Sequence, residues 1–464
     1  MLRVLVRSRR DAKAVEAAVE RFMAGWGVKV ESLGGVRGGR LEEAVASEAD
    51  VFTVVMLGRE DARGLDLDAL RDSMPPLSAI VVTRAARVRN NTVEMIYRSL
   101  VEGRVRIRLE TRWDGRVYLL SGGLGGFELP SIPYVPSGDS FFLFGRGART
   151  LSLFMTRSVG DVPMLFKAGG GRHVVYSGDS VVGEFYAEDG GLVPRGVPYR
   201  GVKAKRVNLS EMVEANSRVF EELERASAEA LRRLEPDPDT VIVPWSGGKD
   251  STAALLVAVK AYGRDAVKAV YVDTGIDFLE NAEYVEKVAG SLGIDLIYKK
   301  ADVDGGLLVE GMPMPDPDYR WCTGRKLDAL RQGFMEAAQG KTVVVTGDRD
   351  GESERRSRRP VRRFDEKLGY PVLSPLKLWS GSHVQGYILW KGLPLNPLYE
   401  AGFYRIGCYV CFALRSWEIE VMRRAGIFRR ILEARPGHKA LIDRFLELKR
   451  KGHGGEFGAC LCGV

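Results

Sequence analysis

The chain has 464 residues and a formal net charge of +8, and 45% of its residues are hydrophobic and 28% charged. A chain of this length can hold two to four domains, each with its own hydrophobic core. No apolar run approaches the ~20 residues of a membrane span, and charges interrupt the N-terminus too early for a signal peptide. We therefore expect no membrane partner and a cytoplasmic location.

The excess of Lys and Arg favours an anionic partner, either a nucleotide or a nucleic acid. Many Arg, Glu and Val residues beside only four His residues are typical of a thermophile. His383, His438 and His453 are too scattered along the chain for a metal site, and we expect them at the surface.

Two patterns divide the first 205 residues. Residues 1–100 alternate apolar runs, at 2–6, 51–56 and 79–82, with helical segments such as 12–23, which predicts a small α/β domain. Residues 101–205 carry short strand-like runs between glycine turns, which predicts a β-rich domain.

Within the β-rich region, the segment Gly178-Asp-Ser-Val-Val182 and the basic strands around it resemble a PUA-type RNA-binding module. The resemblance implies RNA as a partner of the N-terminal half, and a β-rich spacer is the alternative. Residues 206–239 predict a helical linker, with one helix over 209–233 followed by Pro-Asp-Pro-Asp.

The last region, residues 240–464, alternates strands and helices. The predicted strands are residues 240–245, 267–273, 295–299, 342–346 and 371–373. Such an alternation predicts an α/β fold with a doubly wound, mostly parallel sheet, whose ligands lie at the carboxyl ends of the strands.

A glycine turn follows the first of these strands and opens a helix. Its sequence is Ser246-Gly247-Gly248-Lys249-Asp250-Ser251. Glycines let the backbone approach an anion, the amides of a helix start are unpaired, and a lysine and two hydroxyls add donors. We predict a phosphate cradle, with a plain helix-capping turn as the alternative; the spacing is not that of the Walker loop.

Polar residues also follow the second and fourth strands. Asp273 and Thr274 could meet a ribose hydroxyl or a metal-bound water such as that of Mg²⁺, or could form only a turn and a helix cap. Residues 349–363 hold seven Arg and three acidic residues. Because Arg binds sulfate and phosphate through two donors, we predict a second anion site there, with a self-paired surface run as the alternative.

All five cysteines lie in the C-terminal third, at positions 322, 408, 411, 460 and 462. In a cytoplasmic chain they are more often ligands or nucleophiles than disulfides. Cys408-x-x-Cys411 is a metal half-site, which Cys322, Cys460 and Cys462 would complete.

Taken in order, these motifs form one pattern over residues 240–415. It runs from the Ser-Gly-Gly-Lys-Asp-Ser loop through Val272-Asp-Thr-Gly and Trp321-Cys-Thr to Gly347-x-Arg-x-x-Glu-Ser and Asn396-Pro-Leu-Tyr…Gly-Phe-x-Arg-Ile-Gly-Cys-x-x-Cys411. This order resembles the phosphoadenylyl-sulfate (PAPS) reductase family, of the PP-loop, adenine nucleotide α-hydrolase-like superfamily. Nothing in residues 1–230 resembles that family.

The resemblance implies that the chain binds an adenine nucleotide, which could be ATP, adenylyl sulfate (APS) or its 3′-phosphate (PAPS). The loop residues 246–251 would hold its phosphates. Asp273, Thr274, Gly347, Glu352 and Ser353 would complete the nucleotide site. Lys249, Arg349 and Arg356 would act at the sulfate or phosphate end, and Cys460 or Cys462 would be the nucleophile.

In the iron-sulfur branch of the family, an adjacent Cys pair and a Cys-x-x-Cys hold a [4Fe-4S] cluster, and a C-terminal Cys attacks the sulfur of adenylyl sulfate. This chain has only Cys322 in place of the pair and has two tail cysteines. Cys322, Cys408, Cys411 and one tail cysteine would still give four ligands. Four thiolates suit a [4Fe-4S] cluster, favoured by the resemblance, or zinc.

Three functions remain in consideration. The first is reduction of APS or PAPS to sulfite by an external thiol reductant. The second is ATP-dependent adenylation followed by transfer of sulfur from a donor to RNA or a small acceptor, because the intact loop is the form typical of enzymes that cleave ATP. The third is a nucleotide- or nucleic-acid-binding protein without turnover.

Overall fold

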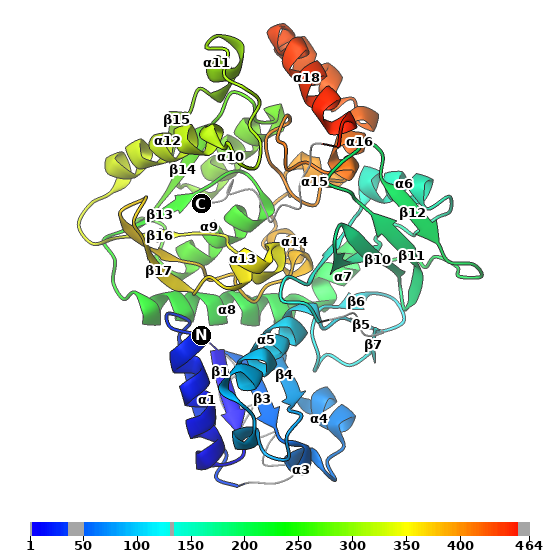
Figure 1. Ribbon diagram of the computed structural model, residues 1–464, viewed down its shortest axis with the longest axis vertical. Coiled ribbons are helices and arrows are strands. Elements are labelled where there is room, and N and C mark those ends of the chain that lie inside the picture. Colours follow the sequence, from blue (N-terminus) through cyan, green and yellow to red (C-terminus); the bar gives the residue numbers. More distant parts are fainter. Residues whose placement is uncertain (1, 36–50, 130–133, 453–464) are drawn as a thin grey trace.

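Four β-sheets organise the chain, as seen in a computed structural model that describes residues 2–35, 51–129 and 134–452. The N-terminal α/β domain, the β-rich middle domain and the C-terminal α/β domain surround the long helix α8 (Ser217–Leu234) (Figure 1). No helix in the described ranges is both long and apolar enough to cross a membrane.

The N-terminal domain has a parallel sheet of order β2-β1-β3-β4; three of its strands coincide with the predicted apolar runs, and β2 was not predicted. Its strands are β1 (Leu2–Val6), β2 (Val28–Ser32), β3 (Phe52–Leu57) and β4 (Ser78–Val82), and its helices are α1 (Arg9–Phe22), α3 (Arg59–Ala62), α4 (Leu67–Ser73), η1 (Val88–Asn90) and α5 (Val93–Leu109). The predicted boundary between residues 100 and 101 falls inside α5, which is one continuous helix capped by Thr92.

The middle domain contains two antiparallel sheets, of order β6-β5-β7 and β12-β11-β10-β9-β8. Their strands are β5 (Arg112–Trp113), β6 (Tyr118–Leu119), β7 (Phe127–Glu128), β8 (Asp139–Phe142), β9 (Met164–Gly169), β10 (Arg172–Ser177), β11 (Ser180–Tyr186) and β12 (Arg195–Pro198), with helix α6 (Gly145–Phe154). Residues 101–205 are thus rich in strands, apart from the end of α5 and helix α6.

The predicted linker helix over 209–233 is two helices, α7 (Leu209–Ala215) and α8. They part at Asn216, whose buried side chain accepts from the Leu120 amide at 2.7 Å and donates to the Tyr118 carbonyl at 2.8 Å. These bonds to the middle domain fix a turn that the helical pattern alone does not predict.

The C-terminal sheet has the order β15-β14-β13-β16-β18-β17, and all but its last pair are parallel. Its strands are β13 (Thr240–Pro244), β14 (Val267–Asp273), β15 (Asp295–Lys300), β16 (Thr342–Val345), β17 (Arg362–Asp365) and β18 (Tyr370–Leu373). The predicted doubly wound α/β fold is confirmed, and only β17, an antiparallel edge strand, was missed.

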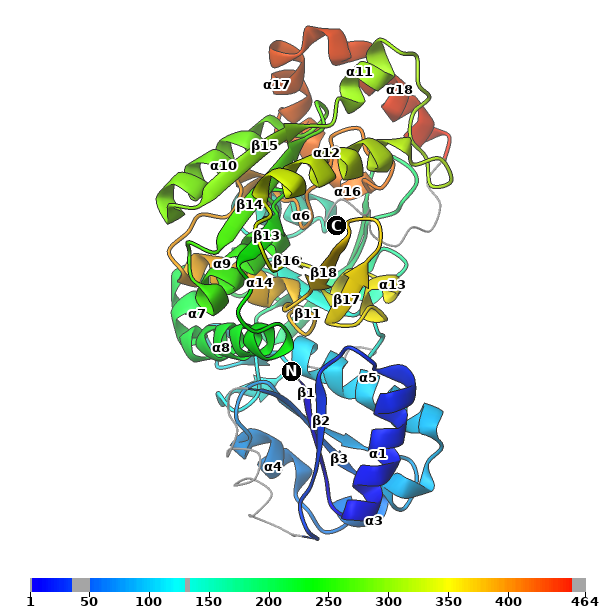
Figure 2. The same ribbon diagram turned by 90° about the vertical axis from the view of Figure 1, so that its left-hand side faces the viewer.

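Helices cover both faces of this sheet because successive strand residues point to opposite sides. Val241 and Val243 pack with α9 (Lys249–Tyr262) and α10 (Leu279–Leu292), whereas Ile242 packs with α12 (Trp321–Ala337). Figure 2 shows these helices around the sheet. The other helices are α11 (Val303–Leu308), η2 (Asp350–Glu352), α13 (Glu354–Ser357), α14 (Gly381–Trp390), α15 (Pro397–Ala401), α16 (Ser416–Arg424), α17 (Ile427–Ala434), η3 (Pro436–His438) and α18 (Lys439–Arg450).

The start of α14 joins the C-terminal domain to strand β8 of the middle domain. The Gln385 side chain accepts from the Phe142 amide at 3.1 Å and donates to its carbonyl at 2.9 Å, which satisfies the edge of β8. The Gly381 amide donates to Asp139 at 2.8 Å. The expectation that His383 lies at the surface is wrong: it is buried, with Nε2 2.7 Å from the Leu120 carbonyl oxygen. His438 is buried too.

Asp350, fully buried, joins the N-terminal and C-terminal domains. Its carboxylate pairs with Arg104 on α5 and, at 2.8 Å, with Lys377. The Arg104 guanidinium lies 3.7 Å from the centre of the Trp26 ring. Buried cations need such counter-charges, so these contacts hold the N-terminal domain in place.

Candidate active site

The predicted phosphate loop lies where β13 ends and α9 begins, as expected. Gly247 has φ +73°, a conformation that favours glycine, and a side chain there would come within 3.2 Å of Val285. Gly248 is the N-cap of α9, so Lys249, Asp250 and Ser251 form its first turn. The loop therefore presents the amides of a helix start at the carboxyl edge of the sheet.

Two residues of the Asn396-Pro-Leu-Tyr399 motif brace this loop. The Lys249 amide donates to the Tyr399 hydroxyl at 2.8 Å, and the Asn396 side chain donates to the Gly247 carbonyl at 3.3 Å. Within the loop, the hydroxyls of Ser246 and Ser251 are 3.2 Å apart. The sequence marked the motif as part of the family pattern but gave no sign that it supports the loop.

A chain of alternating charges runs from the loop into the middle domain. Lys249 Nζ lies 2.8 Å from Asp250, Arg349 Nε lies 2.5 Å from the other Asp250 oxygen, and Arg349 Nη1 lies 3.0 Å from both oxygens of Asp139 on β8. Burial raises the pKa of Asp250, but Arg349 and Lys249 outweigh it, so the net shift is downward. Asp139 carried no signal in the sequence, because its role depends on a residue 210 positions away.

The Gly347–Arg356 segment packs beside the phosphate loop, and its residues make different contacts. A side chain at Gly347 would meet the Asp250 backbone at 2.5 Å, so glycine allows the two backbones to touch. Glu352 accepts from the Arg349 amide at 2.9 Å, and Ser353 accepts from the Arg356 amide at 3.2 Å. Arg356 is buried and pairs with Glu352 and, at 3.2 Å, with Asp348.

The arginine run is largely paired within the protein. Asp348, which is buried, also pairs with Arg359 at 3.0 Å and Arg363 at 3.5 Å. Arg349 lines the cavity described next, and so does the exposed Arg355. Only part of the run therefore faces the space where an anion could bind.

A cavity of about 520 Å³ lies between the phosphate loop and the middle domain. Its C-terminal wall includes Lys249, Asp250, Arg349, Glu352 and Ser353. Its opposite wall comes from the middle domain, chiefly from Asp139, Phe141, Lys167 and His173. This volume is in the usual range for small-molecule sites.

The predicted metal ligands Cys322, Cys408 and Cys411 line a second, smaller pocket together with Thr274. Cys408 Sγ lies 3.6 Å from Thr274 Oγ1 and 3.5 Å from an Asp277 oxygen. Burial, then Asp277 and Cys411, raise the pKa of the Cys408 thiol. The structure thus brings the three cysteines, distant in sequence, to the end of β14, beside the strand that carries the loop.

Asp273 and Thr274 belong to this cysteine side of the sheet edge. Asp273 accepts from the Gly275 amide at 2.8 Å and from the Tyr298 hydroxyl at 2.5 Å, while Thr274 donates its amide to Asp277 at 2.9 Å. Both residues thus take part in a turn, and neither lines the 520 Å³ cavity.

The thiol donor set fits a soft metal centre, since three thiols share one pocket, whose lining also includes the apolar Ile276 and Val303 and the cation Lys326. In residues 2–35, 51–129 and 134–452, however, no three Cys, His, Asp or Glu side chains are grouped as metal ligands. The predicted fourth ligand and the nucleophile, Cys460 and Cys462, lie outside the described residues.

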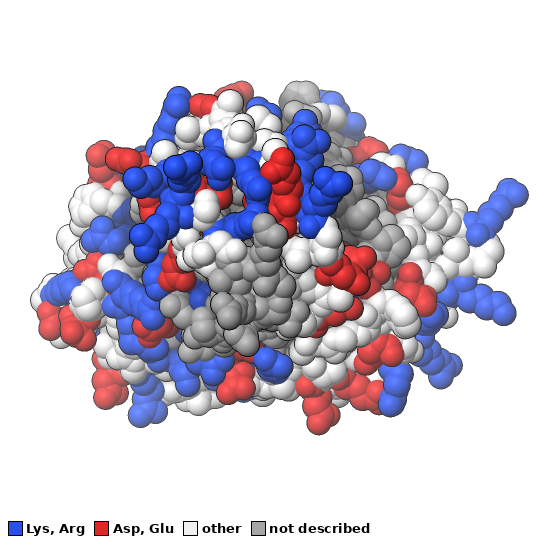
Figure 3. All heavy atoms as spheres, turned by 90° about the horizontal axis from the view of Figure 1, so that it is seen from below, with Lys and Arg blue, Asp and Glu red and all other residues white. Residues whose placement is uncertain are grey.

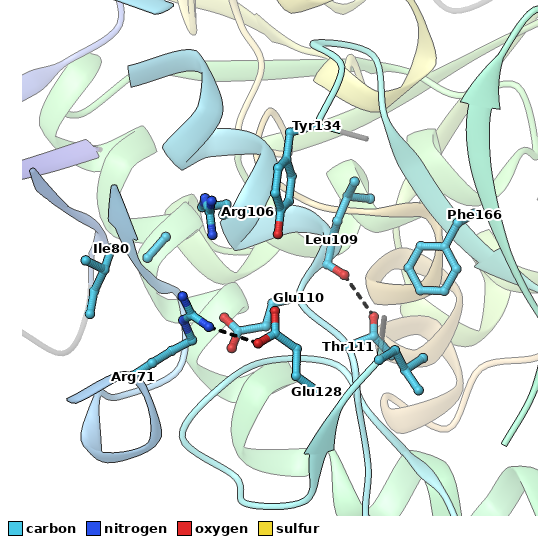
Figure 4. A pocket seen from close by; sticks show the side chains of 11 residues that line it. Arg71, Ile80, Arg106, Leu109, Glu110, Thr111, Glu128, Tyr134 and Phe166 are labelled. Carbon is cyan, nitrogen blue, oxygen red and sulfur yellow. Dashed lines mark hydrogen bonds and ion pairs between the residues drawn. The ribbon is translucent and has the colours of Figure 1, made fainter. Parts of the chain in front are cut away.

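A third hollow, of about 40 Å³, lies between the N-terminal domain and the middle domain (Figure 4). Glu110, Glu128 and Arg71 line it, and Arg71 pairs with Glu128 at 2.9 Å. It is too small for a nucleotide, and it lies away from the loop.

Residues 240–414 match the family model of the phosphoadenosine phosphosulfate reductase domain. The uncharacterized protein MJ0066 of Methanocaldococcus jannaschii is 34% identical over 224 residues, which are 47% of this chain and 46% of that protein, so the chain spans about half the length of this relative. An adenosine 5′-phosphosulfate reductase of Streptomyces coelicolor is 30% identical over 213 residues, 42% of this chain and 86% of that enzyme.

Among solved structures, PAPS reductase from Candida auris in its phosphate complex is 20% identical, with a TM-score of 0.34, over 45% of this chain and 98% of that one. The assignment of the chain to a family rests on the sequence matches, which cover the phosphate loop, Cys322 and the Cys408–Cys411 motif. Through residues 240–414, the chain belongs to the phosphoadenosine phosphosulfate reductase family.

Proposed function

We propose that this protein binds an adenine nucleotide at the loop 246–251 and reduces adenylyl sulfate or its 3′-phosphate to sulfite. The observation that carries the proposal is the convergence of Cys322, Cys408 and Cys411 at the end of β14, next to the strand that ends in the phosphate loop. A sulfur centre and a nucleotide site at one sheet edge suit a reaction at the sulfur of a nucleotide.

The loop would bind the nucleotide phosphate through the amides after Gly247 and through Lys249. Asp250 and Asp139 hold Arg349 in position, so its guanidinium would already be oriented toward the anionic end of the nucleotide before binding. Arg356 would act indirectly, by positioning Glu352, with which it forms an ion pair. Asp273 and Thr274 would approach the nucleoside from the neighbouring strand.

In the reaction, the thiolate of Cys460 or Cys462 would attack the sulfur of adenylyl sulfate. An S–S bond forms, the S–O bond to the nucleotide breaks, and AMP or its 3′-phosphate leaves with the electron pair. An external thiol then attacks the cysteine sulfur and releases sulfite. The two electrons come from thiols, which end as a disulfide.

Cys322, Cys408, Cys411 and one tail cysteine would hold a [4Fe-4S] cluster or zinc. When bound, either centre would keep its ligand thiols deprotonated. The remaining tail cysteine would stay available as the nucleophile.

The test is a sulfite-release assay on anaerobically purified full-length protein with adenylyl sulfate, its 3′-phosphate and a dithiol. Sulfite release that is lost in Cys460→Ser or Cys462→Ser supports the proposal. Absorbance near 400 nm and zinc analysis of the same sample distinguish the two metal centres. If neither nucleotide yields sulfite, the proposed reductase activity is overturned.

A second candidate is ATP-dependent adenylation of an acceptor followed by sulfur transfer. The 520 Å³ cavity beside Lys249 favours it, because adenylation needs room for an acceptor next to the loop. RNA would then be a partner through the N-terminal half. Seen from the N-terminal end, Lys and Arg side chains gather along one side of the surface, with Asp and Glu interspersed (Figure 3).

Pyrophosphate release from ATP separates these functions. Release that requires added RNA or a small acceptor favours adenylation over reduction. Tight nucleotide binding with neither sulfite nor pyrophosphate would identify a binding protein without turnover.

A further inference from the structure

The wall of the 520 Å³ cavity opposite the phosphate loop is built from residues outside the family segment. Lys167 lies on β9 and His173 on β10, in the middle domain, and both line the cavity that Lys249 and Arg349 line from the other side. The middle domain is therefore part of this site.

Lys167 brings to this wall a positive charge that forms no ion pair in the described residues. Its ammonium donates to the carbonyls of Gly351 at 3.2 Å and Glu352 at 3.0 Å. Within the described ranges it has no carboxylate at ion-pair distance. Desolvation lowers the pKa of Lys167 to about 8, although Asp139 opposes the shift. An anionic ligand would supply the missing counter-charge.

His173 is a second unsatisfied group in this wall. It is only 1% exposed, and in the described part of the chain neither ring nitrogen makes a hydrogen bond of normal geometry; the nearest backbone groups are those of Gly171 and Phe185. Its ring packs edge-on against Phe141, at 5.6 Å between ring centres, and against Tyr404, at 5.7 Å. A neutral imidazole here offers one donor and one acceptor to a ligand.

The other cations around the cavity differ in how they are paired. Arg405 pairs with Glu418 at 3.1 Å and Arg415 with Asp189 at 2.9 Å. Arg355, on α13, has no acidic partner in the described segments. Lys167 and Arg355 are thus the two lining cations whose charge is not already matched.

We propose that Lys167 and Arg355, with His173, bind a tetrahedral oxyanion, phosphate or sulfate, that is distinct from the phosphate held by the loop. The inference rests on the proposed nucleotide binding and adds a substrate determinant to it. The oxyanion comes either from a second phosphate of the nucleotide or from a separate substrate. In both cases the middle domain selects which molecule is used.

The test measures binding by calorimetry to the full-length protein. Its titrants are AMP, adenosine 3′,5′-bisphosphate, and sulfate with and without AMP. Lys167→Gln is the main variant, because glutamine can still donate to the Gly351 and Glu352 carbonyls without the charge. Lys203→Ala, an exposed lysine of the same domain, is the matched control. His173→Phe, which preserves the aromatic packing, is a second variant.

In the wild type we expect adenosine 3′,5′-bisphosphate to bind more tightly than AMP if the nucleotide supplies the oxyanion, or sulfate to bind beside AMP if a separate substrate does. Lys167→Gln should weaken the binding of the second oxyanion, on whichever of the two ligands carries it, roughly 10- to 100-fold. It should leave AMP binding within about 2-fold. His173→Phe should weaken binding of the second oxyanion less, and Lys203→Ala should not change it.

The inference is overturned if Lys167→Gln changes the binding of neither adenosine 3′,5′-bisphosphate nor sulfate. It is also overturned if the variant weakens AMP binding as much as binding of the second oxyanion. A wild type that binds no AMP would instead overturn the proposed nucleotide site. The titration with sulfate alone then still tests Lys167.

Discussion

The backbone amide of Lys249 donates a 2.8 Å hydrogen bond to the hydroxyl of Tyr399, a residue 150 positions later in the chain. Both residues are buried. The bond fixes the first turn of α9 and so holds the phosphate loop in one conformation. A pre-formed loop loses less conformational entropy when a phosphate binds.

Replacement of Tyr399 by phenylalanine should therefore weaken nucleotide binding and the fold together. A buried amide left without a partner costs about 1–3 kcal/mol. We expect Tyr399→Phe to lower the unfolding free energy by about that amount in urea titrations. Tyr319→Phe, at an exposed position, is the control and should change nothing. Equal stability of the two variants would show that the hydroxyl does not support the loop.

Removal of the Lys249 charge tests the loop itself. Lys249→Ala should weaken AMP binding roughly 10- to 100-fold, because a charge-assisted contact to phosphate is lost. Lys260→Ala, at the exposed end of the same helix, should bind AMP as the wild type does. Unchanged affinity of Lys249→Ala in calorimetry would refute a role for this lysine in phosphate binding.

Gly347→Ala should shift the loop by steric contact alone. The added methyl group would meet the Asp250 backbone at 2.5 Å, which neither segment can relieve without moving. We expect a loss of about 1–3 kcal/mol in unfolding free energy, together with weaker AMP binding. Gly324→Ala in α12 has open space around it and should be neutral or slightly stabilising. A Gly347→Ala variant as stable as the wild type would contradict the close approach.

Asp350→Asn should destabilise the junction of the N-terminal and C-terminal domains. Arg104 and Lys377 would remain buried without their shared carboxylate, a change that typically costs about 3–5 kcal/mol. Urea unfolding of Asp350→Asn and of Asp318→Asn, an exposed aspartate, provides the comparison. Equal midpoints would mean that the buried cations find other partners.

The pH dependence of stability should carry a contribution from Glu110 (Figure 4). Burial, opposed by Arg112, raises the pKa of Glu110 from 4.5 to about 7. The folded protein thus keeps a proton that the unfolded chain releases, and the unfolding free energy falls by about 3 kcal/mol as the pH rises from 4.5 to 7. Above pH 7 this term is constant.

Glu110→Gln should remove that fall, since glutamine imitates the protonated acid at every pH. The variant should match the wild type near pH 4.5 and be more stable at pH 8. Glu102→Gln, at a partly exposed position of α5, the helix that Glu110 caps, should keep the wild-type slope. Parallel pH profiles for the wild type and Glu110→Gln would contradict the raised pKa.

Local patterns in the sequence predicted the C-terminal fold and the phosphate loop because neighbouring residues determine them. The β-branched run before Ser246 and the two glycines favour a strand, a turn and a helix start locally, although Tyr399 and Asn396 then brace the loop. The edge strand β17 was missed because its residues, Arg362 to Asp365, are mostly charged and lack the apolar strand pattern.

Contacts between residues far apart in the chain could not be predicted from local sequence patterns. Nothing near Asp139 indicates that it meets Arg349, and nothing near Asn216 indicates that its side chain bonds to Tyr118 and Leu120. His383 looked like a surface residue because its burial depends on the middle domain. The role of the Cys460 and Cys462 tail stays a prediction.

The ion pair between Asp139 and Arg349 also bears on how this protein can change over time. A substitution of Arg349 would leave Asp139 without its cation, and a substitution of Asp139 would leave Arg349 paired with Asp250 alone. A different β-rich domain could not be exchanged for this one without a carboxylate at the same place.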